Sequence, residues 1–94
     1  MYMTSRTTSR MPQKGDIWLV EFPYFTPGNM VKVRPAIVLD YNEDTDKVKM
    51  RRLTTQKKKG YKPFINDKMK KRTYITRDIM DIPYYNLIRY IGKA

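Results

Sequence analysis

The chain has 94 residues, a net charge of +11 at pH 7, and neither cysteine nor histidine. A chain this short builds one hydrophobic core, and the two missing residue types exclude a disulfide framework, a thiolate or imidazole zinc site and a histidine general base. No apolar run approaches the ~20 residues that span a bilayer. We therefore expect one soluble, cytoplasmic domain with no metal, no other cofactor and no membrane partner.

The positive charge is concentrated in one segment. Residues 47–72 contain twelve lysines and arginines and a single acid, Asp67, so this segment carries the whole net charge. The rest of the chain has eight basic and eight acidic side chains and is neutral. Such a segment indicates a polyanionic partner, which is either a nucleic acid or an acidic protein, since charge alone does not separate the two.

The elements begin after a polar N-terminal segment. Residues 1–13, rich in Ser, Thr and Arg, predict a flexible arm, and residues 14–94 predict the folded domain. Residues 16–22 are a β-branched and aromatic run, which is typical of a buried strand. Prolines and a glycine then predict a loop over residues 23–32. A second strand is expected at residues 33–40.

Pro35 is expected near the start of the second strand or at a sheet edge, because proline cannot donate a ladder hydrogen bond. A polar cluster at residues 42–46 predicts a hairpin turn, and a third strand follows at residues 48–54. Because side chains alternate along a strand, its residues divide between two faces. Val48, Met50 and Arg52 are expected on one face, and Lys49, Arg51 and Leu53 on the other.

The C-terminal half continues in short elements. Residues 56–62 predict a loop with three consecutive lysines, and a short strand follows at residues 63–65. Residues 73–76 and 79–82 predict two short strands or one bent strand. Pro83 suits the first turn of a short helix that reaches Leu87, and residues 88–91 predict a closing strand. Together these elements predict a mainly β fold, a small antiparallel barrel or curled sheet with one short helix near the C-terminus.

Several segments resemble the MazF/PemK (Kid) family of toxin endoribonucleases. They are Gly15 to Val20, Phe22-Pro23, Val33 to Leu39 with its Arg34-Pro35 pair, Leu53 to Gln56, and Ile82-Pro83 followed by Asn86-Leu87-Ile88 and Ile91-Gly92. The resemblance implies an SH3-like barrel that forms a homodimer and cleaves single-stranded RNA at short sequences. It also implies an antitoxin protein whose acidic tail covers the site.

The resemblance assigns Arg34 to the family's catalytic arginine and Thr54 to its catalytic threonine or serine. When a ribose 2′-hydroxyl attacks the adjacent phosphorus, an arginine can bind two phosphate oxygens and stabilise the charged phosphorane. Thr54 would donate its hydroxyl to the phosphate or orient the attacking group. Glu21 is a candidate base or a partner of Arg34, and a solvent-facing carboxylate is the alternative. Without the resemblance, Arg34 and Thr54 are typical of an ordinary surface arginine and strand threonine.

Aromatic and basic residues of two loops are candidates for RNA contact. Tyr24 and Phe25 are candidates to stack on unpaired bases, and packing against the barrel or a partner chain is the alternative. The lysines are expected to follow the phosphate backbone. The remaining candidates are Lys32, Thr55, Gln56, Lys57, Lys58, Lys59 and Lys62.

Two other functions remain open. A barrel that binds nucleic acid without cleaving it would account for the positive segment equally well. A gyrase-directed toxin shares the barrel but relies on a C-terminal tryptophan, whereas the single tryptophan of this chain is Trp18. We rank the gyrase toxin last.

Overall fold

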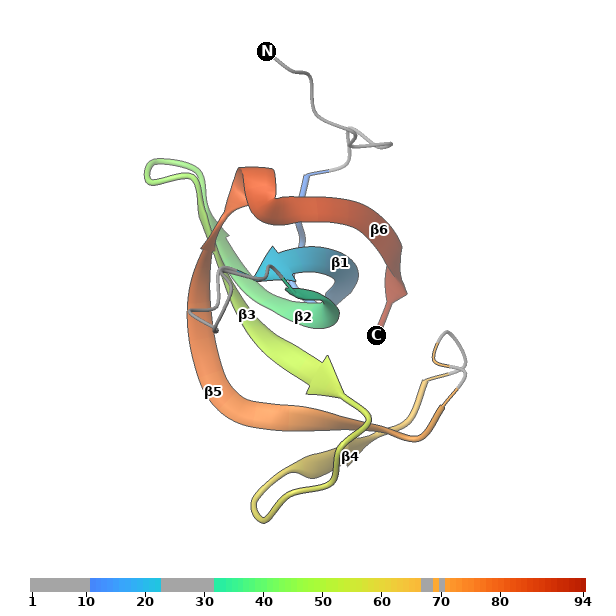
Figure 1. Cartoon of the computed structure of the whole chain (residues 1–94). Helices are drawn as coiled ribbons and strands as arrows, with labels where there is room; N and C mark the ends of the chain where they lie inside the picture. The colour runs from blue at the N-terminus through green and yellow to red at the C-terminus, as the bar shows by residue number, and fades with distance from the viewer. Residues whose placement is uncertain (1–10, 23–31, 67–68, 70) are drawn as a thin grey trace.

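The computed structural model describes residues 11–22, 32–66, 69 and 71–94. In this part of the chain six antiparallel strands form one sheet in the order β4-β5-β3-β2-β1-β6, which curls into a half-barrel (Figure 1). The prediction of a mainly β fold with a small antiparallel barrel and a short C-terminal helix is therefore confirmed. The elements are β1 (Asp16–Phe22), β2 (Lys32–Asn42), β3 (Lys47–Thr54), β4 (Lys62–Phe64), β5 (Thr73–Pro83), the 3-10 helix η1 (Tyr84–Asn86) and β6 (Leu87–Lys93).

Most strand boundaries agree with the sequence to within two residues, and Lys32, expected in a loop, begins β2. Of the two alternatives expected between residues 73 and 82, two short strands or one bent strand, the structure has the single strand β5. The helix expected to reach Leu87 ends earlier, because Leu87 already has extended backbone angles and begins β6. Pro83 precedes the helix as its N-cap and does not occupy its first turn. A membrane-spanning helix is absent from the described residues.

The sheet splits beside Pro35. In β2, Pro35 lies opposite Leu19 of β1, whereas pairing with β3 begins only at Ala36. One side of β2 therefore has no ladder partner at Pro35, as expected for a residue without an N–H group. Beyond this point β3 continues against β5 alone, with Thr54 opposite Tyr74. The split leaves the sheet open between the start of β2 and the end of β3.

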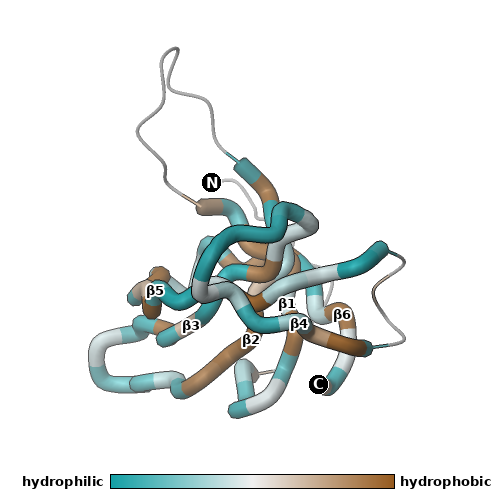
Figure 2. Tube along the Cα trace, turned by 90° about the horizontal axis from the view of Figure 1, so that it is seen from below, coloured by the Kyte–Doolittle hydropathy of each residue, from teal (hydrophilic) through white to brown (hydrophobic). Residues whose placement is uncertain are grey.

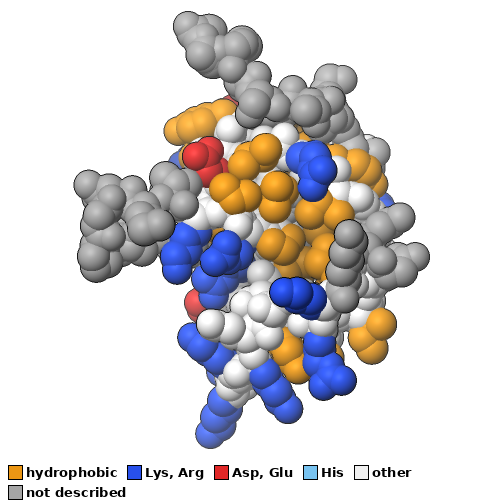
Figure 3. All heavy atoms as spheres, turned by 45° about the vertical axis from the view of Figure 1, so that its right-hand side comes forward, with side chains coloured by type: hydrophobic (Ala, Val, Ile, Leu, Met, Phe, Trp, Pro, Cys, Tyr) orange, Lys and Arg blue, Asp and Glu red, His pale blue; other side chains and the backbone are white. Residues whose placement is uncertain are grey.

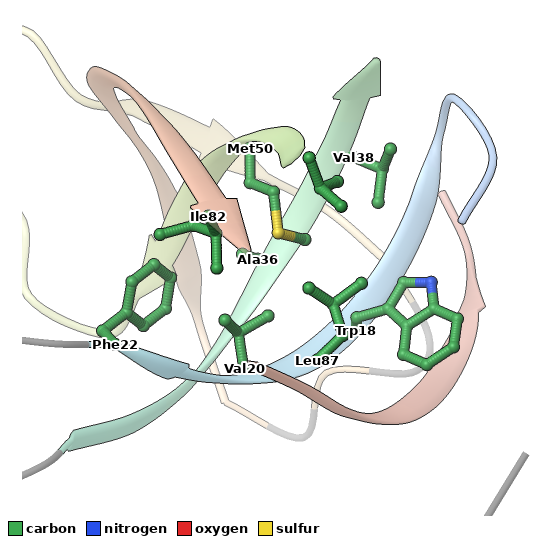
Figure 4. Packing of buried hydrophobic residues seen from close by; sticks show 9 residues of the cluster. Trp18, Val20, Phe22, Ala36, Val38, Met50, Ile82 and Leu87 are labelled. Atoms are coloured by element: carbon green, nitrogen blue, oxygen red, sulfur yellow. The ribbon is translucent and has the colours of Figure 1, made fainter. Parts of the chain in front are cut away.

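The hydrophobic core lies inside the curl of the sheet (Figure 4). Alternate residues of β1 point into it, since side chains along a strand face opposite sides in turn. Trp18 is fully buried, and its ring meets that of Tyr90 edge-on with 5.8 Å between ring centroids. The hydrophobic stretches lie in the strands, and the turns that connect them are mostly hydrophilic (Figure 2). The buried cluster consists of Trp18, Val20, Phe22, Ala36, Val38, Val48, Met50, Ile82 and Leu87.

A hydrogen-bonded group around Asp16 fastens β1 to β6. Asp16 is fully buried; its Oδ2 accepts the backbone N–H of Gln13 at 2.9 Å and the indole N–H of Trp18 at 3.4 Å. Its Oδ1 lies 3.2 Å from Nζ of Lys93. Because Pro12 is buried and Gln13 is bonded to Asp16, the arm expected over residues 1–13 is wrong at its C-terminal end. Residues 1–10 lie outside the described part of the chain.

One hydrogen bond links the two edges of the sheet. β4 and β6 are the edge strands, and the segment after β4 approaches the end of β6. There the side-chain amide of Asn66 donates to the backbone carbonyl of Lys93 at 3.3 Å. This contact links the segment after β4 to the C-terminal end of β6.

Candidate nucleic-acid interface

The split between β2 and β3 contains a cavity of about 410 Å³. We call it the arginine–threonine cavity; it is lined by Arg34, Pro35, Leu53, Thr54, Thr55, Met69, Lys71 and Thr73. The two residues that the family resemblance assigns to catalysis, Arg34 and Thr54, therefore line the same cavity. They come from strands that no longer pair at this point, so the break in the ladder is what makes room between them.

Arg34 lies at the boundary between the hydrophobic core and this cavity. It is opposite Val20 in the pairing of β1 with β2, and opposite residues of a ladder share a face of the sheet. Val20 belongs to the core, whereas Arg34 is exposed. One guanidinium nitrogen, Nη1, donates to the carbonyl of Val33 at 2.9 Å. A guanidinium has five N–H groups, so this bond leaves others for a phosphate.

Thr54 has a hydroxyl that is oriented by the turn that follows β3. Its Oγ1 accepts the backbone N–H of Gln56 at 3.2 Å, which leaves its own proton for donation to a ligand. Thr73 in the same cavity differs, because its hydroxyl donates to the carbonyl of Lys71 at 2.8 Å. Of these two threonines, Thr54 is therefore the better donor to a phosphate oxygen.

Glu21 is not brought to the arginine–threonine cavity. It lies opposite Val33 in the ladder, so its side chain is on the other face of the sheet from that of Arg34. The side chain is exposed, and the backbone carbonyl of Glu21 accepts a hydrogen bond from Asn86 at 2.8 Å. The described lining of the cavity contains no carboxylate at all. The geometry therefore gives no support to Glu21 as a base.

A larger cavity of about 730 Å³ adjoins the first. The two share Met69, Lys71 and Thr73 in their linings. Three aromatic residues and three cations line this aromatic cavity, namely Tyr61, Phe64 and Tyr74 with Lys57, Lys71 and Arg72. Aromatic faces stack on unpaired bases, and cations hold the phosphates between them.

These aromatic residues were not among the contacts predicted from the sequence. The predicted base-stacking residues, Tyr24 and Phe25, lie outside the described residues. The signal for the aromatic cavity was present in the chain, because Tyr61 and Phe64 follow the lysine run at residues 57–59 and have Lys62 between them. Aromatic residues interleaved with basic ones are typical of a surface that binds single strands.

The other predicted contact residues are distributed around these cavities. Thr55 lines the arginine–threonine cavity and Lys57 the aromatic cavity, whereas Lys62 lines a third cavity on the same strands. Gln56, Lys58 and Lys59 are exposed on the turn between β3 and β4, where the carbonyl of Lys58 accepts the N–H of Tyr61 at 3.0 Å. Lys32 is exposed at the start of β2 and lines none of the three cavities.

The fold divides the positive segment of the sequence into two parts. Lys47 and Lys49 lie near the β2–β3 hairpin, where Asp40 and Asp81 line the same cavity and offset their charge. The linings of the arginine–threonine and aromatic cavities contain cations and no described acid. Figure 3 shows lysine and arginine side chains gathered on the lower part of one face, beside exposed hydrophobic side chains. Among the described residues, cations without an acid in the same lining are thus located at these two cavities.

Two further observations bear on the site. Within the described ranges, no group of three or more His, Cys, Asp or Glu side chains is placed to hold a metal ion. In comparisons with known proteins, no family model matches the chain and no curated protein matches it. The resemblance to the MazF/PemK family therefore stays a prediction from the sequence.

Proposed function

We propose that this protein is an endoribonuclease that cleaves single-stranded RNA. The observation that carries the proposal is that Arg34 and Thr54 line one cavity. The adjoining aromatic cavity supports it, because unpaired bases next to the cleaved phosphate would have aromatic faces and cations beside them. Specificity for a short sequence would follow from contacts between the bases and this lining.

The cleavage needs positioning and charge stabilisation. The ribose 2′-oxygen forms a bond to phosphorus, the bond from phosphorus to the 5′-oxygen breaks, and the products are a 2′,3′-cyclic phosphate and a 5′-hydroxyl. Arg34 would bind the phosphorane oxygens, and Thr54 would donate its hydroxyl proton as a hydrogen bond to one of them. In this proposal the 2′-hydroxyl proton passes to water, since the described lining has no carboxylate. The leaving 5′-oxygen takes a proton from water.

Cleavage of single-stranded RNA in EDTA tests the proposal. Arg34→Ala should lower the rate by about 10²–10³-fold, as expected for loss of a donor that stabilises the transition state. Thr54→Val should also lower it, and Thr54→Ser should restore it, because serine keeps the hydroxyl. Arg89→Ala is the matched control, since Arg89 is exposed on β6 and lines none of the three cavities. Equal cleavage by Arg34→Ala and Arg89→Ala, or no cleavage by the wild type, would contradict the proposal.

The second candidate is a barrel that binds nucleic acid without cleaving it. It is favoured by the hydrogen bond from Arg34 to the carbonyl of Val33, which holds part of the guanidinium against its own strand. A gel shift with intact single-stranded RNA separates the two functions. Retention of RNA that stays uncut at every protein concentration supports the binder, and scission under the same conditions supports the endoribonuclease.

The biological role that we propose is the toxin of a toxin–antitoxin pair, acting as a homodimer. The uncompensated cations around the two cavities would attract an acidic antitoxin segment as well as RNA. A small acidic protein encoded in the neighbouring reading frame should bind the toxin and stop cleavage. Sedimentation of the purified protein tests the homodimer.

A further inference from the structure

A third cavity, of about 310 Å³, lies on β3 and β5 next to the turn before β4. It is lined by Arg51, Gly60, Lys62, Ile75, Thr76 and Arg77. None of these residues lines the arginine–threonine or the aromatic cavity, so the three linings identify a separate site. Its described lining carries three cations and no acid. We call it the tricationic cavity.

Two buried polar groups in this lining have no hydrogen-bond partner within the described structure. They are Nε of Arg51 and Oγ1 of Thr76, and Thr76 is only 1 % exposed. Nearly all buried polar groups in proteins are hydrogen-bonded, and a buried donor without an acceptor is unfavourable. Both groups can donate, and both residues line the same cavity. An acceptor bound there would satisfy them.

The turn before β4 lies against the side chain of Arg77, one of the three cations. Gly60 has a φ of +88°, and a Cβ atom at this position would lie 2.6 Å from Cδ of Arg77. The bare backbone of the turn therefore packs directly on the side chain of Arg77. A larger residue would strain the turn and displace that side chain. The glycine thus leaves room for the side chain of Arg77 to lie beside the cavity.

We propose that the tricationic cavity binds a phosphate group. Arginine forks and a threonine hydroxyl match the several acceptor oxygens of a phosphate, and Lys62 adds a point charge. The phosphate could be inorganic phosphate or a phosphodiester of a nucleic-acid strand, which present the same oxygens. This site goes beyond the proposed endoribonuclease and does not depend on it, because it uses neither Arg34 nor Thr54.

The first experiment is an NMR titration of the full chain with inorganic phosphate against sodium chloride at equal ionic strength. Phosphate should shift the backbone amides of Gly60, Thr76 and Arg77 in a saturable way. Arg77→Ala and Thr76→Val should each weaken binding, Arg77→Ala by about tenfold or more, since a hydrogen bond to a charged group is lost. Arg89→Ala should bind as the wild type does. Equal phosphate affinity in Arg77→Ala and Arg89→Ala would overturn the proposal.

The Gly60→Ala variant tests whether phosphate binds to a specific arrangement of side chains or is attracted only by the local positive charge. It changes no charge, so general attraction predicts unchanged phosphate binding, whereas displacement of Arg77 predicts binding weakened as in Arg77→Ala. Thr76→Val is a second charge-preserving variant, and it makes the same distinction if Gly60→Ala does not fold. Unchanged binding in the folded charge-preserving variants would overturn the proposal.

A second titration distinguishes the two sources of phosphate. A single-stranded oligonucleotide is added to Arg34→Ala and to the double variant Arg34→Ala with Arg77→Ala, so that cleavage does not interfere. Weaker oligonucleotide binding by the double variant, with competition by inorganic phosphate, identifies a strand phosphodiester as the ligand. Equal oligonucleotide binding by the two, with phosphate binding lost only in the double variant, identifies the free anion.

Discussion

Two regions of the half-barrel differ in whether their buried polar groups have hydrogen-bond partners. At the end where β1 meets β6, the buried carboxylate of Asp16 has Gln13, Trp18 and Lys93 as partners. At the other end, on β3 and β5, Arg51 and Thr76 have buried polar atoms without a partner in the described structure. A satisfied buried polar group stabilises the fold, whereas an unsatisfied one is unfavourable until it finds a partner. We call the first region the closed end and the second the open end, and we expect the closed end to maintain the barrel and the open end to bind ligands.

A single strand connects the two ends. In β3, Val48 and Met50 belong to the core, while Arg51 and Thr54 line cavities. The register of β3 against β5 shifts between Arg51 and Leu53. Such a shift reorients side chains locally. Near this shift β3 carries both kinds of residue, because Leu53 is fully buried whereas Arg51 and Thr54 line cavities. Substitutions of the two kinds should therefore separate stability from function.

The largest expected effect is the loss of core packing at the closed end. Trp18→Ala should lower the free energy of unfolding by about 3–5 kcal/mol, because it removes a fully buried ring and leaves a cavity. Urea denaturation followed by circular dichroism measures this change. Tyr85→Ala is the control; Tyr85 is 74 % exposed, and its loss should change the stability by under about 0.5 kcal/mol. Similar losses in both variants would contradict the assignment of the core.

The next effect comes from the polar group at the same end. Asp16→Ala should cost about 1–3 kcal/mol, because it leaves the N–H groups of Gln13 and Trp18 without their acceptor. Lys93→Ala should cost about 0–1 kcal/mol, since the lysine side chain is 50 % exposed and water screens its charge. The comparison uses urea denaturation of both variants. A larger loss for Lys93→Ala than for Asp16→Ala would show that the ion pair, and not the hydrogen bonds, holds β1.

Substitutions at the open end should change binding and leave the stability alone. Replacing Lys57, Lys58 and Lys59 together by alanine removes three exposed cations from the turn before β4. In a plot of log affinity for single-stranded RNA against log salt concentration, the slope should decrease in magnitude by up to ~2, since each phosphate contact contributes ~0.7. Urea denaturation of the same variant should match the wild type. An unchanged slope would place the RNA away from this turn.

The smallest expected effect lies at the β2–β3 hairpin, where opposite charges are balanced. The hydroxyl of Tyr41 donates to Oδ1 of Asp46 at 2.9 Å, and this hydrogen bond, with burial and the negative charge of Asp46, raises the pKa of Tyr41 from 10.0 to about 12. The folded state therefore keeps a proton that the unfolded chain releases. This contribution to stability is complete below pH 10 and is lost as the pH rises through about 12.

Titration of tyrosinate absorbance, with Tyr41→Phe to assign the signal, measures the Tyr41 pKa. Asp46→Asn should lower it toward the ordinary value, since the charge is removed while asparagine tolerates the positive φ of 57° at this position. A Tyr41 pKa that stays the same in Asp46→Asn would exclude the aspartate as its cause.

The strands were predictable because their patterns are local. Residues 16–22 match β1 residue for residue, and the polar cluster at residues 42–46 marks the hairpin correctly. The predicted helix was too long at its C-terminal end. A proline such as Pro83 also suits the position just before a short helix, and Leu87 is extended because it pairs with Val20 of β1. That pairing depends on residues far away in the chain, which local propensity does not include.

The candidate site was predictable only in part. The family resemblance selected Arg34 and Thr54, and the fold places both on one cavity. The aromatic and tricationic cavities depend on the register of β4 against β5, which brings Lys62 opposite Ile75. A three-residue strand contains too little pattern to fix such a register. Glu21 was predicted as a candidate base because it lies near the end of the first strand. Side chains alternate along β1, so that of Glu21 lies on the opposite face of the sheet from Arg34.

The unequal placement of charge along the fold also affects how the protein meets a polyanion. Lys47 and Lys49 are offset by nearby acids at the hairpin, whereas the described linings of the other three cavities contain cations and no acid. We therefore expect the electric field to be more positive beside these cavities than at the hairpin. Such a field turns an approaching partner toward that side and raises the association rate by ~10-fold or more at low salt. A nucleic-acid strand should thus first contact the protein near the cavities, and it should reach them sooner than by random rotation alone.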